Sequence, residues 1–484
     1  MKRLRVFGKL VLISLAIVAT MFLLFIKKPS YSKKPNIIIL SIDTLRADHL
    51  SCYGYFRETS PNIDAFSKDA VLFQNSISQA PFTAPAHMSI FTSLTPSVHQ
   101  ITSSNETISS GTGINRGKEI LKRLDQRIET FPLIMKKNGY LTIGLHGGGN
   151  VSAEFGFDRG FDIYREWGDP LELKDRIEDV RKAIIESKKK NAPLFIFLHH
   201  YVCHDPYLNS PDEFSSHFIS EKVNGLPLRR EDIYSKDIDD RREYFWKQID
   251  LSNSKHRDHV VSLYDGGIYY SDYIFGKLIE TLKKENFYSN SIVILLSDHG
   301  EEFYEHLDKL HWRLLIETLH VPLIIKFPRN IYGGKIIHAP VRTMDIMPTL
   351  LDFLRIKTHS FMQGVSFLPL IRRKGNYSPC IVSYSLSQAL KNKWTTRFIK
   401  EGFVYSNQFS HGVEERLFDM NNDPLEKNNL SAYKPEILGQ MHLLARIILE
   451  KDRVIREKIG CKNSVLIEKK EQLLKELKSL GYTQ

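Results

Sequence analysis

Three apolar stretches of the sequence are each followed by side chains that can bind a metal or transfer a proton. The stretches cover residues 36–42, 193–198 and 291–296. The polar residues that follow them are Asp43, then His199, His200 and His204, then Asp298 and His299. Continuous apolar runs rich in β-branched residues are typical of parallel strands buried on both faces. Because sites in open α/β sheets form outside the carboxyl ends of the strands, these groups indicate an enzyme.

A metal is the first chemistry that these residues suggest. Asp43, Asp298 and His299 offer two carboxylates and one imidazole. Mixed oxygen and nitrogen ligands favour zinc, manganese or iron, with calcium or magnesium as alternatives. We therefore expect a divalent metal at these residues. Taken alone, Asp43 is equally compatible with the N-cap of a helix in the segment Asp43-Thr44-Leu45-Arg46.

A hydroxyl group is the second candidate. Thr83 precedes Ala84-Pro85, and proline is favoured in the first turn of a helix. At a helix N-terminus, the free N–H groups and the helix dipole stabilise an anion. A metal bound to the same oxygen would lower its pKa further and give a usable alkoxide. The alternative is that Thr83 only caps the helix.

The run from Thr83 to Ser93 resembles the signature of the sulfatase family, Cys/Ser-x-Pro-Ser-Arg followed by a helix. Asp43 and the triplet Asp298-His299-Gly300 resemble metal-binding positions of sulfatases and of their relatives in the alkaline phosphatase superfamily. Three later segments also match in order, at 345–351, 363–370 and 417–426. The resemblance extends over roughly 35–430. It implies a sulfatase-like hydrolase of sulfate or phosphate esters whose metal ligands are Asp43, Thr83, Asp298 and His299.

The first residue of the signature departs from the family pattern. Sulfatases oxidise a Cys or Ser there to formylglycine, and threonine cannot be converted in this way. The resemblance therefore implies that Thr83 itself attacks sulfur or phosphorus. A formylglycine sulfate ester is released by elimination, whereas a threonine ester needs a second displacement. Phosphate esters on Ser or Thr turn over by that route in the superfamily, so Thr83 shifts the expectation toward phosphorus substrates.

The resemblance assigns further roles to histidines. His204 matches a family histidine that touches the oxygens of the transferred group. His311 lies thirteen residues after Asp298, where relatives place a Lys or His against the substrate anion, and it can also protonate a leaving group. His87 stands where sulfatases have Arg, and it is a further candidate catalytic residue that could hold Thr83 or the metal-bound oxyanion. His146 and Asn150 lie in a segment that lacks the family's Lys, and they are weaker candidates, as are His199 and His306.

Two other functions stay open at this point. The chain can be a membrane-anchored transferase that moves phosphoethanolamine or phosphoglycerol onto an envelope glycan or lipid, since superfamily transferases of that kind use a Thr nucleophile. It can also be an inactive relative that binds an envelope component. Acceptor-dependent turnover would identify the transferase, and absence of metal after purification from metal-replete cells would identify the inactive relative.

The spacing of elements predicts an α/β fold with a mostly parallel central sheet. Helical patterns occupy 117–137 and 263–285, and a strand-like pattern occupies 394–405. Alternation of strands and helices favours a parallel sheet covered by helices. The expected units are a membrane anchor with linker (1–34), a catalytic domain (35–345), a small C-terminal α+β subdomain (346–430) and a helical tail (431–484). Residues 205–259 are expected to form an insertion or lid beside the site.

The N-terminus predicts a membrane anchor. Basic residues precede and follow an apolar run at 10–26, which is close to the minimum length for a spanning helix. No clear signal-peptide cleavage site follows, so we expect a single-pass anchor, with a removed signal peptide as the alternative. Because both flanks are basic, they do not fix the orientation. The N-terminal position of the segment favours a catalytic domain outside the cytoplasm. The net charge of +11 suits anionic membranes or an anionic sulfate- or phosphate-ester substrate on an envelope glycan or lipid. No motif for nucleic-acid binding accompanies it, and the 4 cysteines form no CxxC pair.

Overall fold

The computed structural model describes residues 34–102, 120–220, 223, 225–227, 229–234, 241–357, 361–373, 377, 379–387, 393–407, 414–423, 425–461 and 465–468. The predicted anchor therefore lies outside the described residues, as do residues 462–464 and 469–484 of the predicted helical tail. Among the described residues, no helix combines the length and the apolar character needed to cross a membrane.

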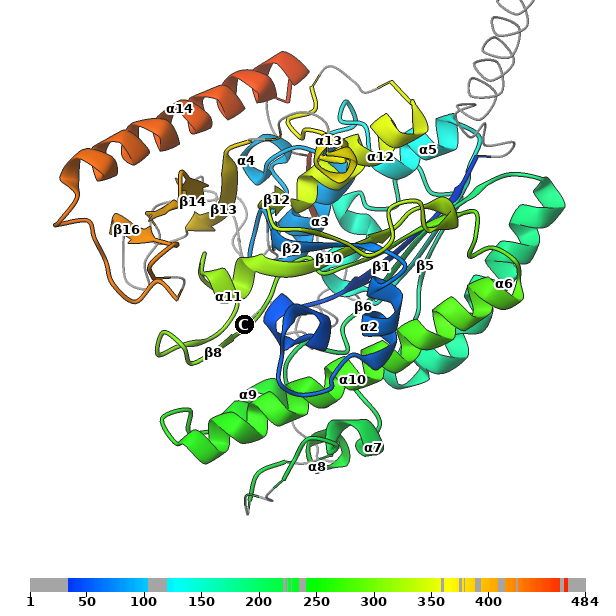
Figure 1. The fold of residues 1–484 in the computed structure, drawn as a ribbon, viewed down its shortest axis with the longest axis horizontal. Coiled ribbons are helices and arrows are strands. Elements are labelled where there is room, and N and C mark those ends of the chain that lie inside the picture. Colours follow the sequence, from blue (N-terminus) through cyan, green and yellow to red (C-terminus); the bar gives the residue numbers. More distant parts are fainter. Residues whose placement is uncertain are drawn as a thin grey trace, which may run out of the picture. The chain divides into compact units, whose positions relative to one another are not determined.

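A mixed sheet of nine strands forms the centre of the compact unit that begins at Asn36 (Figure 1). Its order is β11 (Lys335–Ile337), β2 (Val71–Ile77), β10 (His320–Lys326), β7 (Ser291–Leu296), β1 (Asn36–Ile42), β6 (Leu194–His200), β4 (Leu141–His146) and β5 (Ile163–Glu166), and β12 (Val341–Arg342) also pairs with β2. β10 runs antiparallel to both of its neighbours, and the other pairs are parallel. The expected α/β class is confirmed, with one antiparallel strand inside the sheet.

The three strands predicted from the apolar runs are neighbours. β1 pairs in parallel with β7 on one side and with β6 on the other, and Ser41 is in register with both Leu296 and His199. The residues that follow β1 and β7 therefore emerge at the same edge of the sheet. β6 continues through His200, two residues beyond the apolar run, so His199 and His200 belong to the strand and point to opposite faces.

Helices cover both faces of this sheet (Figure 1). One face carries α3 (Thr83–Thr92), α5 (Phe131–Lys137) and α12 (Ile346–Leu354), and the other carries α2 (Pro61–Ser67), α6 (Leu173–Lys190) and α10 (Ser254–Lys284). The side chains of β1 alternate between the two cores: Ile37 and Ile39 join the first, whereas Ile38 and Leu40 join the second. Burial on both faces explains why the residues from Ile37 to Leu40 are all apolar.

The expected helix at 117–137 is wrong in its described N-terminal part. Residues Ile120–Arg123 form strand β3, which pairs with β17 (Val465–Glu468). The helix α5 begins only at Phe131, after Thr130, whose hydroxyl accepts a hydrogen bond from the backbone N–H of Leu133. The pattern could not reveal the strand because its partner lies more than 300 residues away. The expected helix at 263–285 is confirmed as the C-terminal part of α10.

In the part of segment 205–259 that the structure describes, three short helices precede α10, which begins at Ser254. They are α7 (Asp212–Ser215), α8 (Glu231–Tyr234) and α9 (Arg241–Lys247). From α9, Arg242 pairs with Asp205, and the indole N–H of Trp246 donates to the same carboxylate at 3.0 Å. This segment is therefore attached directly beside His204.

A second, antiparallel sheet follows the first. It consists of β13 (Ile381–Ser387), β14 (Lys393–Lys400), β15 (Phe403–Ser406) and β16 (Arg416–Asp419), and the long helix α14 (Pro435–Ile459) packs against it. The strand-like pattern at 394–405 is thus a hairpin of two strands that turns at Glu401-Gly402. The predicted domain boundary falls just before α12, which shares its core with α3; the domain boundaries stay predictions.

One buried carboxylate joins α14 to the first sheet's helices. Asp452 accepts hydrogen bonds from the hydroxyls of Thr95 at 3.0 Å and of Ser97, and from the phenol of Tyr384 at 2.8 Å. The amide of Gln363 donates to it at 2.6 Å. Thr95 and Ser97 belong to the corner between α3 and α4 (Pro96–His99).

Short elements complete the described chain. They are η1 (Ala47–His49), η2 (Ser51–Tyr53), η3 (Gly149–Val151), η4 (Ala153–Phe155), η5 (Pro170–Glu172), β8 (Glu302–Phe303), β9 (Lys309–Leu310), α11 (Ile316–Leu319), η6 (Pro328–Asn330), η7 (Thr343–Asp345) and α13 (Leu368–Arg372).

Candidate active site

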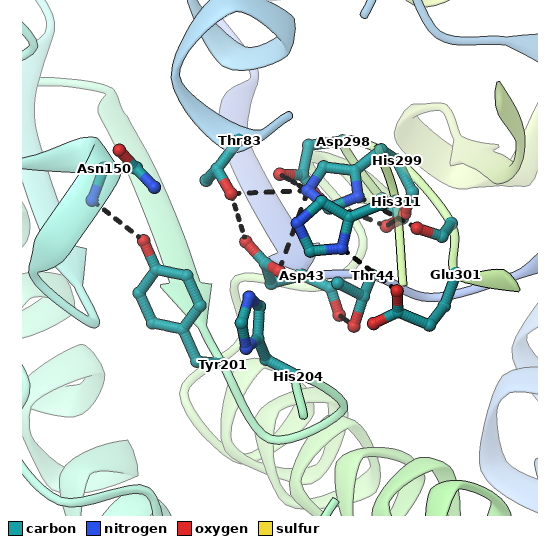
Figure 2. A network of polar contacts seen from close by, with 12 residues as sticks. Asp43, Thr44, Thr83, Asn150, Tyr201, His204, Asp298, His299, Glu301 and His311 are labelled. Atoms are coloured by element: carbon teal, nitrogen blue, oxygen red, sulfur yellow. Dashed lines mark hydrogen bonds and ion pairs between the residues drawn. The ribbon is translucent and has the colours of Figure 1, made fainter. Parts of the chain in front are cut away.

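The carboxyl ends of β1 and β7 bring the predicted metal ligands together. One ligand atom each of Asp43, Asp298 and His299 lies within 4.8 Å of the others. Nε2 of His299 is 3.5 Å from Oδ2 of Asp298 and 4.0 Å from Oδ1 of Asp43. All three side chains are fully buried, and Figure 2 shows them converging on one point. The alternative of Asp43 as a helix cap does not hold, because the next helical turn begins only at Ala47.

The unsatisfied oxygens of this cluster fit a cation. Oδ1 of Asp43 and Oδ2 of Asp298 are buried without a hydrogen-bond partner. Burial and the charge of Asp298 raise the pKa of Asp43. Burial also opposes ionisation of Asp298, but His299 and His87 outweigh it and lower the pKa of Asp298. Two adjacent carboxylates with orphaned oxygens and one imidazole are a donor set that suits a divalent metal.

Thr83 adds a hydroxyl to the cluster. It is the first residue of α3, after the N-cap residue Phe82. Its Oγ1 lies 3.1 Å from Oδ2 of Asp43 and 3.3 Å from Nε2 of His299. The hydroxyl thus points at the metal-ligand set from the positive end of a helix dipole.

His87 supports the first turn of α3. Its Nδ1 is 3.0 Å from the carbonyl oxygen of Thr83, and its Nε2 shares a hydrogen bond with the hydroxyl of Ser41 at 2.8 Å. Nδ1 also lies 3.4 Å from Oδ2 of Asp298. Burial lowers the pKa of His87. The neutral imidazole therefore positions Thr83 through its backbone and contacts one ligand carboxylate.

His204 and His311 lie on the other side of the cluster. Their ring centroids are 5.5 Å apart, and the His311 ring is 4.4 Å from that of His299. Nδ1 of His311 is 3.0 Å from Oε1 of the buried Glu301, which holds the ring in place. Burial lowers the pKa of His204 to about 4. Burial and the neighbouring His299 lower the pKa of His311, so both imidazoles are neutral at pH 7.

The weaker histidine candidates differ in whether they contact the predicted metal ligands. Nε2 of His199 is 3.3 Å from Oδ2 of Asp43, so this residue contacts the cluster. His146 stacks on Tyr164 and accepts a hydrogen bond from the N–H of Gly148 at 3.0 Å. His306 pairs with Glu317 at 3.3 Å. The last two have local structural partners instead of contacts with the metal-ligand set.

Several supporting residues were missed from the sequence. Thr44 has a φ of 57° in the left-handed region, which is strained for a β-branched residue. The phenol of Tyr264 holds this turn: it accepts from the N–H of Arg46 at 2.8 Å and donates to the carbonyl of Thr44 at 2.7 Å. Tyr264 comes from α10, and only the fold brings it to β1. Glu301 was visible in the sequence, three residues after Asp298, but nothing there indicated its histidine partner.

The fold and the site are those of an α/β enzyme whose predicted metal ligands lie at the carboxyl ends of two parallel strands. The family model "Sulfatase" matches residues 35–356, and a second model, "N-sulphoglucosamine sulphohydrolase, C-terminal", matches residues 304–450. The chain belongs to the sulfatase family. It is a hydrolase of the class that cleaves sulfuric esters.

Individual relatives agree with this assignment. An arylsulfatase of Clostridium perfringens is 23% identical over 82% of this chain and 90% of its own length. An N-acetylglucosamine-6-O-sulfatase of Bacteroides thetaiotaomicron is 22% identical over 82% of this chain and 83% of its own length.

Solved structures show the same fold. BT4656, solved in complex with its substrate D-glucosamine-2-N,6-O-disulfate, superposes with a TM-score of 0.68 at 19% identity over 88% of this chain and 99% of its own. The phosphonate monoester hydrolase of Agrobacterium radiobacter superposes with a TM-score of 0.66 at 17% identity over 90% of this chain and 100% of its own.

Proposed function

We propose that this protein hydrolyses sulfate or phosphate esters through a covalent ester on Thr83, and that phosphorus esters are its better substrates. The observation that carries the proposal is the position of the Thr83 hydroxyl, 3.1 Å from Asp43 and 3.3 Å from His299 at the start of α3. A chain that cannot form formylglycine at this position still presents an oxygen to the metal-ligand set.

Asp43, Asp298, His299 and Thr83 would hold the metal. When bound, a divalent ion would lower the pKa of the Thr83 hydroxyl and neutralise charge on the transferred group. Zinc, manganese or iron suits the mixed donors best. The two orphaned carboxylate oxygens support this assignment.

The residues of the chain would then act in two displacements. Oγ1 of Thr83 attacks sulfur or phosphorus, a bond forms between them, and the ester bond to the leaving oxygen breaks. Water attacks the same centre in the second step, and the bond to Oγ1 breaks, which releases sulfate or phosphate and restores Thr83. His87 keeps the first turn of α3 oriented during both steps. Because a threonine ester offers no elimination route, the second displacement favours phosphorus over sulfur.

His204 and His311 would bind oxygens of the transferred group and move protons. Nδ1 of His311 is engaged with Glu301, so proton exchange would take place at Nε2. As a neutral imidazole, His311 can take the proton that the Thr83 hydroxyl loses in the first step and pass it to the leaving oxygen. In the second step it can take a proton from the attacking water and pass it to Oγ1 of Thr83 as that bond breaks. His204 is held by its own hydrogen bond to the carbonyl of Asp205 at 3.1 Å.

The substrate would carry its ester on a glycan or lipid of the envelope. Relatives named N-acetylglucosamine-6-O-sulfatase and ulvan-active sulfatase act on sulfated glycans, which supports a glycan. The basic-flanked apolar run at 10–26 supports a single-pass anchor with the catalytic domain outside the cytoplasm. Membrane fractionation of the full chain, and protease accessibility in intact cells, test the anchor and its orientation.

The decisive experiment compares the chain from about residue 30 onward, purified with its metal, with its Thr83→Ala variant. The substrates are nitrophenyl sulfate, nitrophenyl phosphate and bis(nitrophenyl) phosphate. Phosphorus-ester cleavage that disappears in the variant supports the proposal. Sulfate cleavage that survives the substitution contradicts it and points to a water molecule as the direct nucleophile. Turnover that appears only with an added glycan or lipid acceptor would instead indicate a transferase.

A further inference from the structure

Asn150 lies in a rigid turn beside the helix that carries Thr83. It belongs to η3, which packs against α3. Its backbone N–H donates to the phenol oxygen of Tyr201 at 3.2 Å, and that phenol donates to the carbonyl of Gly148 at 3.1 Å. The turn is therefore fixed through its backbone, without help from the Asn150 side chain.

The side-chain amide of Asn150 is buried and unsatisfied. The residue is 1% exposed, and neither its Oδ1 nor its Nδ2 has a hydrogen-bond partner. Figure 2 shows the amide pointing toward Thr83, away from the fixed backbone contact. Leaving a buried polar group unpaired destabilises the folded state. An apolar side chain of similar shape would avoid this cost, so the amide calls for a partner that arrives with the substrate.

We propose that Nδ2 of Asn150 donates a hydrogen bond to a non-bridging oxygen of the ester that Thr83 attacks. This inference rests on the proposed function, because it requires the reacting sulfur or phosphorus to sit next to Thr83. Negative charge grows on those oxygens as the nucleophile adds. A donor already fixed in a dry site stabilises that charge without further reorganisation. The contact is made by a neutral amide, so it depends on donor geometry and not on a cationic side chain.

The test separates a functional amide from a structural one through Asn150→Leu. Removing one such donor is expected to lower kcat/KM on the preferred nitrophenyl ester by about 10²–10³-fold. The melting temperature of the metal-loaded protein is expected to stay the same or to rise, because the substitution removes an unsatisfied buried group. Asn150→Asp replaces the donor by an acceptor of the same shape, and it is expected to lose activity equally while metal content confirms that the site is still loaded.

Asn36→Leu is the matched control. Asn36 is also buried, but its Oδ1 accepts from the N–H of Leu194 at 3.0 Å and its Nδ2 donates to the hydroxyl of Ser291 at 3.4 Å. It lies at the end of β1 opposite the site. We expect this variant to lose melting temperature and to keep kcat/KM within about threefold per folded molecule.

Two results would overturn the inference. One is an Asn150→Leu or folded Asn150→Asp protein that keeps kcat/KM within about threefold of the wild type. The other is a loss of activity in both variants that is accompanied by a fall in melting temperature as large as that of Asn36→Leu, which marks a structural amide. Failure of the proposed function is recognised separately, because Thr83→Ala would then remain active whatever the Asn150 variants do.

Discussion

The hydroxyl of Thr83 donates a hydrogen bond to Oδ2 of Asp43 at 3.1 Å, and this contact joins the turn after β1 to the first residue of α3. The two residues are 40 positions apart in the sequence. Neither the residue types nor the number of positions between the two residues predicts this contact. The fold of the parallel sheet brings them together. Substitutions at the two residues test the proposed nucleophile and the proposed metal ligand separately.

Thr83→Ser keeps the hydroxyl and removes only a methyl group. We expect it to retain kcat/KM within about tenfold of the wild type, because the serine oxygen can occupy the same position near Asp43. Steady-state kinetics on the preferred nitrophenyl ester measure this. Loss as complete as in Thr83→Ala would show that the hydroxyl is not what the reaction needs.

Asp43→Asn removes one of two adjacent buried carboxylates. We expect bound metal, measured by elemental analysis, to be lost. The stabilisation that metal gives the wild type, about 3 kcal/mol at a hundredfold excess over Kd, is expected to be lost with it. Without metal, the variant is expected to melt higher than the wild type, because repulsion between Asp43 and Asp298 is relieved.

The control for metal loss is Asp169→Asn, which removes a surface carboxylate that pairs with Arg230. It should bind metal like the wild type. Full metal occupancy in Asp43→Asn would contradict the proposed ligand set.

The loss of activity in His311→Gln is expected to depend on the leaving group of the ester. Removing a general acid–base group costs about 10²–10⁴-fold where proton transfer is needed. We expect a loss in that range on a methyl or other alkyl ester and a much smaller loss on nitrophenyl esters, whose leaving oxygen needs no proton. His306→Gln, which removes the partner of Glu317, is the control and should show no such dependence. Equal losses on both ester types would leave His311 with a binding role only.

Titration of Asp272, which is separate from the predicted metal ligands, makes the free energy of unfolding depend on pH. From α10 it accepts hydrogen bonds from the N–H groups of Asn62 at 3.1 Å and Ile63 at 2.7 Å, at the N-terminus of α2. Burial raises the pKa of Asp272 to about 6, although these donors oppose the shift. The folded state therefore binds this proton more tightly than the unfolded state, whose aspartate pKa is about 3.9. The stabilisation of the folded state by Asp272 is complete below about pH 4 and is lost as the pH rises through about 6.

The corresponding variant is Asp272→Ala, studied by denaturant unfolding across this range. We expect the substitution to destabilise the protein more at about pH 4.5 than at about pH 7.5. A penalty that grows as the pH rises would mean that the ionised form is the stabilising one, contrary to the burial argument.

The sequence allowed the central strands and their catalytic ends to be predicted. Continuous burial makes the central residues of β1 and β7 apolar, and the change in residue type before Asp43 and Asp298 marks where the two strands end. The length of β6 was underestimated because His199 and His200 are polar residues inside a strand. The local pattern predicts helix at the residues of strand β3. The pairing of β3 with β17 is a contact between distant segments, and no local pattern records it.

The site was predictable where residue type alone implies chemistry. Carboxylates, imidazoles and a hydroxyl at strand and helix ends could be proposed as ligands or nucleophile, whereas a tyrosine on a long helix could not. Tyr264 and Tyr201 act through their phenol groups on the backbone of turns, and such contacts depend on how α10 and β6 are packed. The unsatisfied amide of Asn150 became informative only once its surroundings were known.

The carboxylate of Asp452 connects α14 to the helix that carries Thr83. Because Asp452 in α14 holds Thr95 and Ser97, it holds the corner at which α3 ends, and Thr83 stands at the other end of that same helix. Shortening the protein before α14 would therefore not release an independent catalytic core. In a library of random variants screened for turnover, substitutions along residues 435–459 should appear among the inactive clones although none of them touches the substrate.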